Sequence, residues 1–349
     1  LVHQSKISNR EEYPDKLINE LTDQFEIFGS IAECASSFEH NLLASAFFEV
    51  FSYTWKLNNL FNVLLNTEVA LLSRSTDLFR RNSTLTKFLS FYAQTNGVDY
   101  LNEVLLPVIK ELVDNDVQFE VEKQDNSDTA DLFILYLSRI IDLIVNSTDK
   151  LPHAFKLVSK AIYDSVSNKF PEAALTAVSS FVFLRFLCPA IISPEQHFKL
   201  PINNPKVKRS LMQLVKVLQN MANGTLTSIK WPAIAGKTEE LNFYNQKIDG
   251  FLKIISTDVT TENQSAESYK PEKPLTSLRY LHKFIYHYFA KIRYNFLFQH
   301  SWRCNYLLHD KAVKFKKFDY LVMQMGQPNP GVKLQMSSKL KLLDTNNLD

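Results

Sequence analysis

The sequence predicts an all-α fold, and three observations carry that prediction. Glycine is scarce, at 7 of 349 residues, while long apolar side chains are abundant, which favours helices over turn-rich β structure. Apolar residues recur three or four positions apart along most of the chain, as they do on one face of a helix. No strand-like alternation or hairpin dipeptide stands out. The chain is long enough to bury a large core.

The helical spacing appears in order along the chain. It occurs in Leu17–Phe28, Leu85–Tyr92, Leu132–Val145, Phe155–Val166 and Val207–Met221. We predict a helix over each stretch, because positions three and four apart share a face that can be buried. No internal repeat with a fixed period occurs, which weighs against a solenoid.

Polar segments interrupt this pattern and predict connections. Glu122–Asp131 is predicted to be a loop between helices, and Ser256–Pro274 a longer, flexible one. Met336–Asp349 is a polar tail. Four prolines predict an irregular connection between two helices: Pro189, Pro194, Pro201 and Pro205.

Several classes of function lack support. The formal net charge is only +2, and basic clusters are not interleaved with aromatic residues, so we expect no nucleic acid partner. The cysteines, Cys34, Cys188 and Cys304, lie far apart, which suits a reducing compartment and argues against a disulfide framework or zinc cluster. Neither a GxSxG nucleophile nor an HExxH metal pair occurs. We therefore predict no metal, no cofactor and no catalytic centre that works alone.

Nucleotide binding and membrane insertion are not indicated either. Gly236-Lys237-Thr238 resembles the end of a phosphate-binding loop, but Trp231 stands where that loop requires its first glycine. We find no signal peptide, and we expect no apolar run to reach the ~20 residues that a membrane span needs. The longest, near 173–192, is interrupted by Arg185 and Pro189. We expect no membrane anchor. Because the chain begins at Leu1, we also expect it to be part of a longer protein.

Two adjacent arginines lie in the segment Asp77–Lys87 (DLFRRNSTLTK). A helix is predicted to begin at about Ser83, with Asn82 or Ser83 as its N-cap, so Arg80 and Arg81 fall in a short loop. Two interpretations are open. The arginines are two solvated side chains, or the loop presents a guanidinium to an anion. Arginine suits phosphate because its planar fork donates several hydrogen bonds and stays charged.

Arg185 is the only formally charged residue between Glu172 and Glu195. Its neighbours on the predicted helix are apolar, and a buried guanidinium is costly unless its donors are satisfied. One interpretation is a structural arginine that bonds loop carbonyls in the core. The other is an arginine that holds a functional loop in place, and the two are compatible.

Charge is unevenly distributed along the chain. No Asp or Glu occurs from Gln196 to Thr238. Arg209, Gln213, Lys216 and Asn220 recur at helical spacing and share one face. A charge run is usually a solvated face, but one this long also suggests a basic surface that attracts an acidic partner. The seven basic residues of the run are Lys199, Lys206, Lys208, Arg209, Lys216, Lys230 and Lys237.

Three segments together resemble Ras GTPase-activating domains. They are DLFRRNSTLTK, FLRFLCPAIISP (Phe183–Pro194) and LVKVLQNMAN (Leu214–Asn223), in the order that this family has them. The N-terminal helices and His309–Gly326 are most similar to the neurofibromin branch, which includes the fungal inhibitory regulators of Ras. The resemblance spans residues 15–330.

The resemblance implies an all-helical fold with a central catalytic part, 46–250, and an outer part formed by both chain ends, 1–45 and 251–349. It implies that Arg80, directly after Phe79, is the arginine finger, and that Arg185 braces the finger loop through its backbone carbonyls. Lys216 matches the lysine that contacts the GTPase. We expect the partner surface to comprise Phe79, Arg81, Asn82, Lys87, Arg209, Lys216 and Gln219.

The implied function is activation of GTP hydrolysis in trans. The partner would be a GTP-bound Ras-family GTPase that carries the GTP and Mg²⁺, and the result would be down-regulation of Ras signalling. A cytoplasmic chain would then reach membranes peripherally, through that partner. Two alternatives stay open: a non-catalytic effector or scaffold of the same fold, and a helical adaptor unrelated to GTPases.

Overall fold

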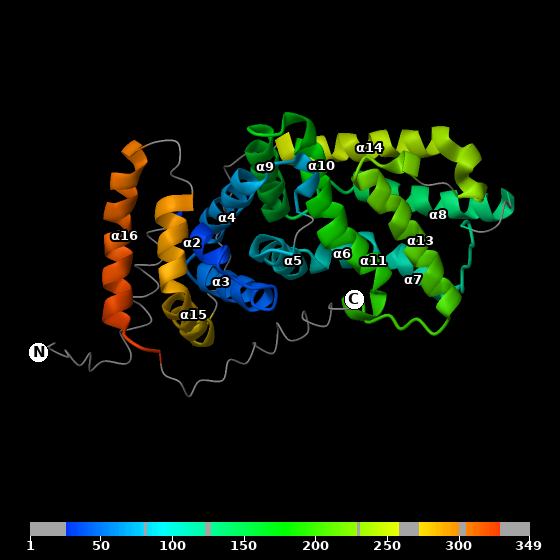
Figure 1. Cartoon of the computed structure of the whole chain (residues 1–349). Coiled ribbons are helices and arrows are strands. Elements are labelled where there is room, and N and C mark those ends of the chain that lie inside the picture. Colours follow the sequence, from blue (N-terminus) through cyan, green and yellow to red (C-terminus); the bar gives the residue numbers. More distant parts are fainter. Residues whose placement is uncertain are drawn as a thin grey trace, which may run out of the picture. The chain divides into compact units, whose positions relative to one another are not determined.

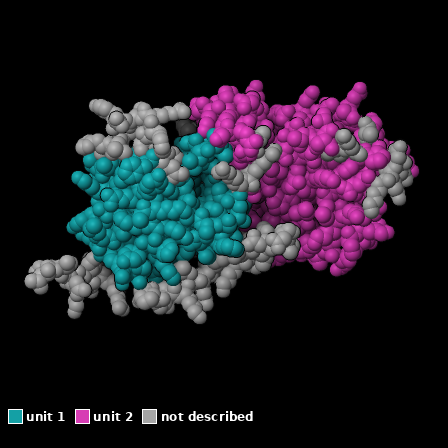
Figure 2. Space-filling view, in the orientation of Figure 1, with its two compact units in different colours: residues 1–72, 80–91, 265–349 teal, residues 73–79, 92–264 magenta. Residues whose placement is uncertain are grey.

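A computed structural model describes residues 26–79, 82–122, 127–228, 231–257, 272–299 and 305–328. All regular elements among these residues are helices, so the predicted all-α fold class is confirmed (Figure 1). The chain forms two compact units, coloured separately in Figure 2. Unit 1 comprises 1–72, 80–91 and 265–349, and unit 2 comprises 73–79 and 92–264.

Unit 1 is a helical cluster built from both ends of the chain. In its core the rings of Phe28, Phe47 and Phe51 pack edge to face, with Phe28 lying 5.3 Å from Phe47 and 4.8 Å from Phe51. Helix α15 packs against α2, α3 and α16. The helices are α2 (Glu26–Ala32), α3 (His40–Tyr53), α4 (Leu57–Leu71), α15 (Leu275–Tyr294), η6 (Asn295–Gln299), α16 (Asn305–Met325) and the first part of α5 (Thr84–Asn96).

Unit 2 is the larger helical assembly. Its centre is α10, which packs on α9 and α14, while α13 packs against η3 and α11. The elements that unit 2 has before residue 170 are η1 (Ser75–Asp77), α6 (Val98–Val104), α7 (Leu106–Asp114), α8 (Ser127–Val145) and α9 (His153–Ser167). The later ones are η2 (Pro171–Ala173), α10 (Ala174–Ser179), η3 (Ser180–Leu187), α11 (Cys188–Ile192), α12 (Pro194–His197), α13 (Pro205–Ala222), η4 (Leu226–Ser228), η5 (Pro232–Lys237) and α14 (Thr238–Thr257).

We predicted that the central and outer parts meet at 45/46 and 250/251, and these boundaries stay predictions. The compact units change at 72/73, 79/80, 91/92 and 264/265. Helices α3 and α4 belong to unit 1 because they pack with α2 and α15. How the activity divides between the parts stays a prediction.

The run Pro171–Ile192 is apolar and long enough to cross a membrane by length and composition alone, which corrects our expectation that no run reaches that length. Two thirds of its most apolar window, 67%, is buried inside the molecule. It is therefore the central helix of unit 2, where burial of its side chains stabilises the fold.

The predicted connections are partly helical. Helix α8 already begins at Ser127, inside the loop predicted over Glu122–Asp131. Among the four prolines, Pro194 and Pro205 open helices, where a missing N–H is tolerated. The connection therefore contains the short helices α11 and α12. Most of the loop at 256–274 and the whole polar tail lie outside the described residues.

Candidate functional site

Phe79 has an unusual backbone conformation directly before Arg80. Its φ is 52°, in the left-handed region, and its side chain is only 2% exposed. This region is rarely adopted by bulky residues and costs about 1–3 kcal/mol, so surrounding contacts must hold it. The fold thus maintains an unfavourable conformation at the residue that sets the direction of the chain into Arg80.

Arg185 lies on η3, a π-helical stretch whose wide turn has a local cause. Pro189 has no N–H, and in an α-helix its ring would clash with the carbonyl four residues earlier, which belongs to Arg185. Here the N–H of Cys188 bonds the carbonyl of Phe183, five residues back. The wider turn accommodates the proline, and such π-helical turns occur frequently at functional sites.

The two residues meet in unit 2. Nη2 of Arg185 donates a hydrogen bond of 2.6 Å to the carbonyl oxygen of Phe79. A donor that carries a charge makes a stronger hydrogen bond than a neutral one, and Arg185 is half-buried, which limits competition from water. We call this hydrogen bond the brace. It fixes the strained peptide that precedes Arg80, which is the form of contact that the family resemblance implies.

Phe186, the residue after Arg185, fixes the same turn from the core. Its ring lies 4.5 Å from that of Phe155 and 5.8 Å from that of Tyr100, measured between centroids. Gly97 makes room for this ring, since a Cβ there would lie 2.2 Å from a ring carbon of Phe186. A larger residue at position 97 would therefore displace the turn that carries Arg185.

The other expected finger-loop residues are placed only in part. Arg80 and Arg81 lie outside the described residues. Asn82 is exposed and Lys87 half-buried, both in unit 1. Of the two candidate N-caps, Ser83 is confirmed, because its Oγ accepts a 3.2 Å hydrogen bond from the N–H of Thr86 and α5 begins at Thr84. The N–H of Ser83 in turn donates to Oγ1 of Thr86, at 3.0 Å.

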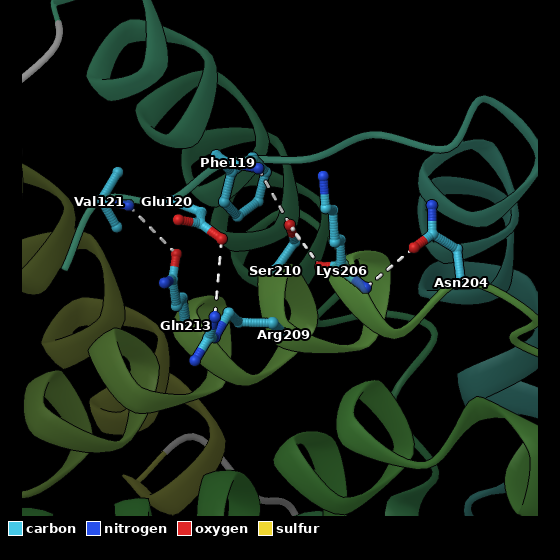
Figure 3. A network of polar contacts seen from close by, with 8 residues as sticks. All are labelled: Phe119, Glu120, Val121, Asn204, Lys206, Arg209, Ser210 and Gln213. Atoms are coloured by element: carbon cyan, nitrogen blue, oxygen red, sulfur yellow. Dashed lines mark hydrogen bonds and ion pairs between the residues drawn. The ribbon is translucent and has the colours of Figure 1, made fainter. Parts of the chain in front are cut away.

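Helix α13 carries the face that we predicted for an acidic partner, and we call its residues Arg209, Gln213, Lys216 and Asn220 the α13 stripe. Asn204 caps its start, with Oδ1 accepting a 3.0 Å hydrogen bond from the N–H of Lys206 (Figure 3). Arg209 and Lys216 are exposed in part, while Gln219 is half-buried. Gln213 is buried, so this face is not wholly open to solvent.

An extended segment covers part of that face. We call Val117–Glu122 the acidic segment. It leaves α7 through Asp116, whose φ of 53° closes the helix, with N–H groups of Asp116 and Val117 bonded to the carbonyls of Val113 and Leu112.

Alternate residues of the acidic segment then bond α13. The N–H of Phe119 donates to Oγ of Ser210 at 3.0 Å, and that of Val121 to Oε1 of Gln213 at 3.4 Å (Figure 3). Ser210 and Gln213 are both buried, so these bonds satisfy polar groups that water does not reach.

This segment places acids beside the predicted basic surface, whose role in binding a partner stays a prediction. Glu120 lies 3.6 Å from Nη1 of Arg209, and Glu122 lies 3.1 Å from Nζ of Lys216. The acid-free run therefore does not form an acid-free surface, because Glu120 and Glu122 lie next to Arg209 and Lys216 in the folded chain. Two further ion pairs are Lys208 with Glu195, at 3.8 Å, and Lys237 with Asp131, at 2.7 Å. Lys230 lies outside the described residues.

The acidic segment and Trp231 did not emerge from the sequence as parts of this site. A signal was present for the segment: Phe119 and Val121 are apolar and alternate with Glu120 and Glu122, a period of two within a helical protein. Trp231 gave no such signal, because only the folded chain brings its ring to 4.8 Å from Nζ of Lys216.

Comparisons with known proteins indicate the family of the chain. Residues 119–223 match the family described as GTPase-activator protein for Ras-like GTPase. The chain is 32% identical over 294 residues to Inhibitory regulator protein IRA2 of Saccharomyces cerevisiae, covering 82% of this chain and 9% of that protein. It is 35% identical over 265 residues to IRA1 of the same yeast, covering 74% of this chain and 8% of that protein.

A human relative extends the likeness beyond fungi. Ras GTPase-activating protein 1 of Homo sapiens is 26% identical over 243 residues, which cover 66% of this chain and 23% of that protein. The chain thus spans less than a tenth of the length of the two yeast relatives. With the family match, the yeast relatives and the helical fold together, the chain belongs to the family of GTPase-activator proteins for Ras-like GTPases.

Proposed function

We propose that this chain accelerates GTP hydrolysis by a Ras-like GTPase by inserting Arg80 as an arginine finger. One observation supports this most directly: the brace from Arg185 holds the strained carbonyl of Phe79, one residue before Arg80. A fold that fixes the backbone at this point limits where the next side chain can go. Such control is useful if that side chain must enter another protein's active site with its geometry set in advance.

In the proposed reaction the partner binds GTP and Mg²⁺ and orients the attacking water. The guanidinium of Arg80 would lie against the γ-phosphate oxygens and the leaving oxygen, where charge is redistributed in the transition state. For Ras and its activating proteins, the well-studied case of this chemistry, a supplied arginine raises kcat by about 10³–10⁵, a magnitude that we adopt rather than derive. This chain needs no nucleotide site of its own for that role.

The partner surface in this proposal includes the α13 stripe. Lys216 offers an exposed cation for a carboxylate of the GTPase, and Arg209, Gln219, Asn82, Lys87 and Arg81 are proposed to lie at or near the contact. Because these side chains are exposed or half-buried where they are described, their charges would act mainly on encounter and affinity. A membrane-bound partner would bring the chain to the membrane surface.

The rival function is a non-catalytic effector or scaffold that grips the GTPase without changing its rate. Arg80 favours the catalytic function, because the resemblance implies that non-catalytic members of this fold lack an arginine at this position. An unrelated helical adaptor is opposed by the family membership.

The deciding experiment measures phosphate release from a purified Ras protein loaded with GTP, with this chain at catalytic concentration. We compare wild type with Arg80→Ala and Arg81→Ala, which remove neighbouring guanidinium groups and serve as matched controls. We expect wild type to accelerate release by orders of magnitude, Arg80→Ala to lose at least about 10³ of kcat, and Arg81→Ala to keep it.

Other outcomes have distinct meanings. If Arg81→Ala is the inactive variant, the mechanism holds and the finger is the next residue. If wild type binds the GTP-loaded protein but leaves its hydrolysis rate unchanged, the effector function is correct and this proposal is lost. If it neither binds nor activates any Ras protein tested, the adaptor function replaces both.

A further inference from the structure

We infer that Trp231 is a positioning residue that, together with Glu122, holds the ammonium group of Lys216 ready for the partner. The inference rests on the proposed function, because it concerns how the α13 stripe meets the GTPase. No motif in the sequence pointed to Trp231, which stood out only for breaking a phosphate-loop pattern. Its role follows from the contacts that surround Lys216 in unit 2.

Lys216 is held from two sides. Its Nζ lies 3.1 Å from Oε1 of Glu122 and 4.8 Å from the centroid of the Trp231 ring. The distance to the ring is within the range of about 6 Å for a cation–π contact, which is strongest with tryptophan. An ammonium group has three N–H donors. One carboxylate and one ring face leave it a donor for a partner, and the side chain remains 54% exposed.

Trp231 and Glu122, the two residues that hold Lys216, are themselves fixed by further contacts. Trp231 is 7% exposed, and its ring packs edge to face on Phe133, with centroids 6.3 Å apart. Phe133 packs in the same way on Phe119, at 5.3 Å. Phe119 belongs to the acidic segment, which also carries Glu122 and is bonded to α13 through Ser210 and Gln213. The aromatic chain therefore links the two holders of Lys216 to each other.

This arrangement has an energetic consequence for binding. A free lysine has many rotamers, and ordering such a side chain at an interface costs binding free energy. If Lys216 is already ordered in the free protein, that cost is met during folding and binding is tighter. Loss of the indole should therefore raise the KM for the GTPase by about 2- to 10-fold, while kcat stays unchanged because the finger is untouched.

The test uses Trp231→Leu, with Trp231→Phe as a matched variant that keeps an aromatic face. KM and kcat for a purified GTP-loaded Ras protein are measured for both, alone and combined with Lys216→Met. We expect Trp231→Leu to raise KM, Trp231→Phe to lie near wild type, and Trp231→Leu to add nothing once Lys216 is Met. Thermal unfolding of each variant identifies losses that come from stability alone.

A second measurement does not depend on activity. The ring current of a nearby indole shifts the ε-methylene resonance of Lys216 upfield in wild type, which ¹³C-labelled lysine makes visible. Lys216→Met assigns the signal, and Glu122→Gln should move it toward the position of a free lysine. A wild-type resonance at the free-lysine position would overturn the inference.

The kinetic outcomes separate this inference from the proposed function. A wild-type chain that does not accelerate hydrolysis defeats the proposed function first. If wild type is active but Trp231→Leu leaves KM unchanged, or raises it equally in the Lys216→Met background, Trp231 is structural and the inference is wrong. An unchanged KM for Lys216→Met itself also overturns it, since there would then be no contact to prepare.

Discussion

The brace and the α13 stripe are both built on basic side chains, but they differ in what those side chains meet. Arg185 is half-buried and donates to a neutral backbone carbonyl, whereas Lys216 is exposed in part and faces a carboxylate. A guanidinium on a carbonyl fixes the course of the chain. A cation that is paired with a nearby carboxylate attracts an acidic partner less strongly, because the carboxylate offsets part of its charge. We therefore expect the brace to govern kcat and stability, and the stripe to govern KM.

Of changes in these two regions, the largest change in kcat should come from Arg185→Ala, which removes the brace. Without the brace, Phe79 can relax from its left-handed conformation, and a misplacement of order 1 Å at a catalytic group costs roughly 100-fold in rate. We expect a kcat lower by about that factor, together with a loss of about 1–3 kcal/mol in unfolding free energy from the unsatisfied carbonyl. GTPase assays and urea unfolding of the same preparations measure both.

Arg185→Lys is the control for that prediction. It keeps a charged donor but loses the planar fork, so its kcat should lie between those of wild type and Arg185→Ala. If Arg185→Ala loses stability while its kcat stays within twofold of wild type, the brace is a core contact only and the comparison fails.

A smaller effect is expected at the stripe, from Lys216→Met. This change removes the cation but keeps an apolar stem, so KM for the GTP-loaded partner should rise by about 3- to 10-fold with kcat unchanged. The difference from wild type should shrink as salt is raised, because exposed charges are screened within a Debye length of about 10 Å at 0.1 M. A fall in kcat, or a KM difference that ignores salt, would contradict the assignment of Lys216 to encounter and affinity.

The two regions also differ in how well the sequence predicted them. The apolar surroundings of Arg185 required its donors to be satisfied inside the fold, and a bond to a loop carbonyl was among the expected solutions. The conformation of Phe79 could not be foreseen, because a phenylalanine disfavours the left-handed region and only tertiary contacts impose it.

At the stripe the sequence did not reveal the neighbouring acids, for a physical reason. Helical spacing shows which residues share a face, but it does not show what covers that face. Glu122 and Lys216 are 94 positions apart, so no local pattern relates them. A charge run in the sequence is therefore weak evidence for a charged surface, whereas an isolated charge in an apolar helix is better evidence for a specific buried bond.

A third prediction concerns the support of the acidic segment. Arg139 on α8 donates two hydrogen bonds to Glu111 on α7, at 2.8 and 2.7 Å, and these hold the pKa of Glu111 down at about 2. A carboxyl whose folded pKa is depressed adds stability above its unfolded pKa. That stability is lost as the pH falls from about 4.5 toward about 2.

Urea unfolding across this pH range should show the loss in wild type. Glu111→Gln should flatten the slope. Arg139→Met should flatten it less, because the hydroxyl of Tyr136 still donates a 3.1 Å hydrogen bond to Glu111, and the double variant should match Glu111→Gln. Equal slopes in wild type and Glu111→Gln would show that the carboxyl does not contribute through its protonation.

The smallest effect is expected at the other end of the stripe, from Arg209→Ala. Nη1 of Arg209 lies 3.6 Å from Glu120, and the two side chains are 49% and 40% exposed, so solvent screens the pair and its worth is about 0–1 kcal/mol. We expect KM to change by less than about twofold, with Glu120→Gln as the matched control. Among the described contacts of α13, Lys216 has a cation–π contact with Trp231, and no such contact is described for Arg209. A KM change as large as that of Lys216→Met would mean that exposure, and not the holding of the side chain, decides which cation the partner uses.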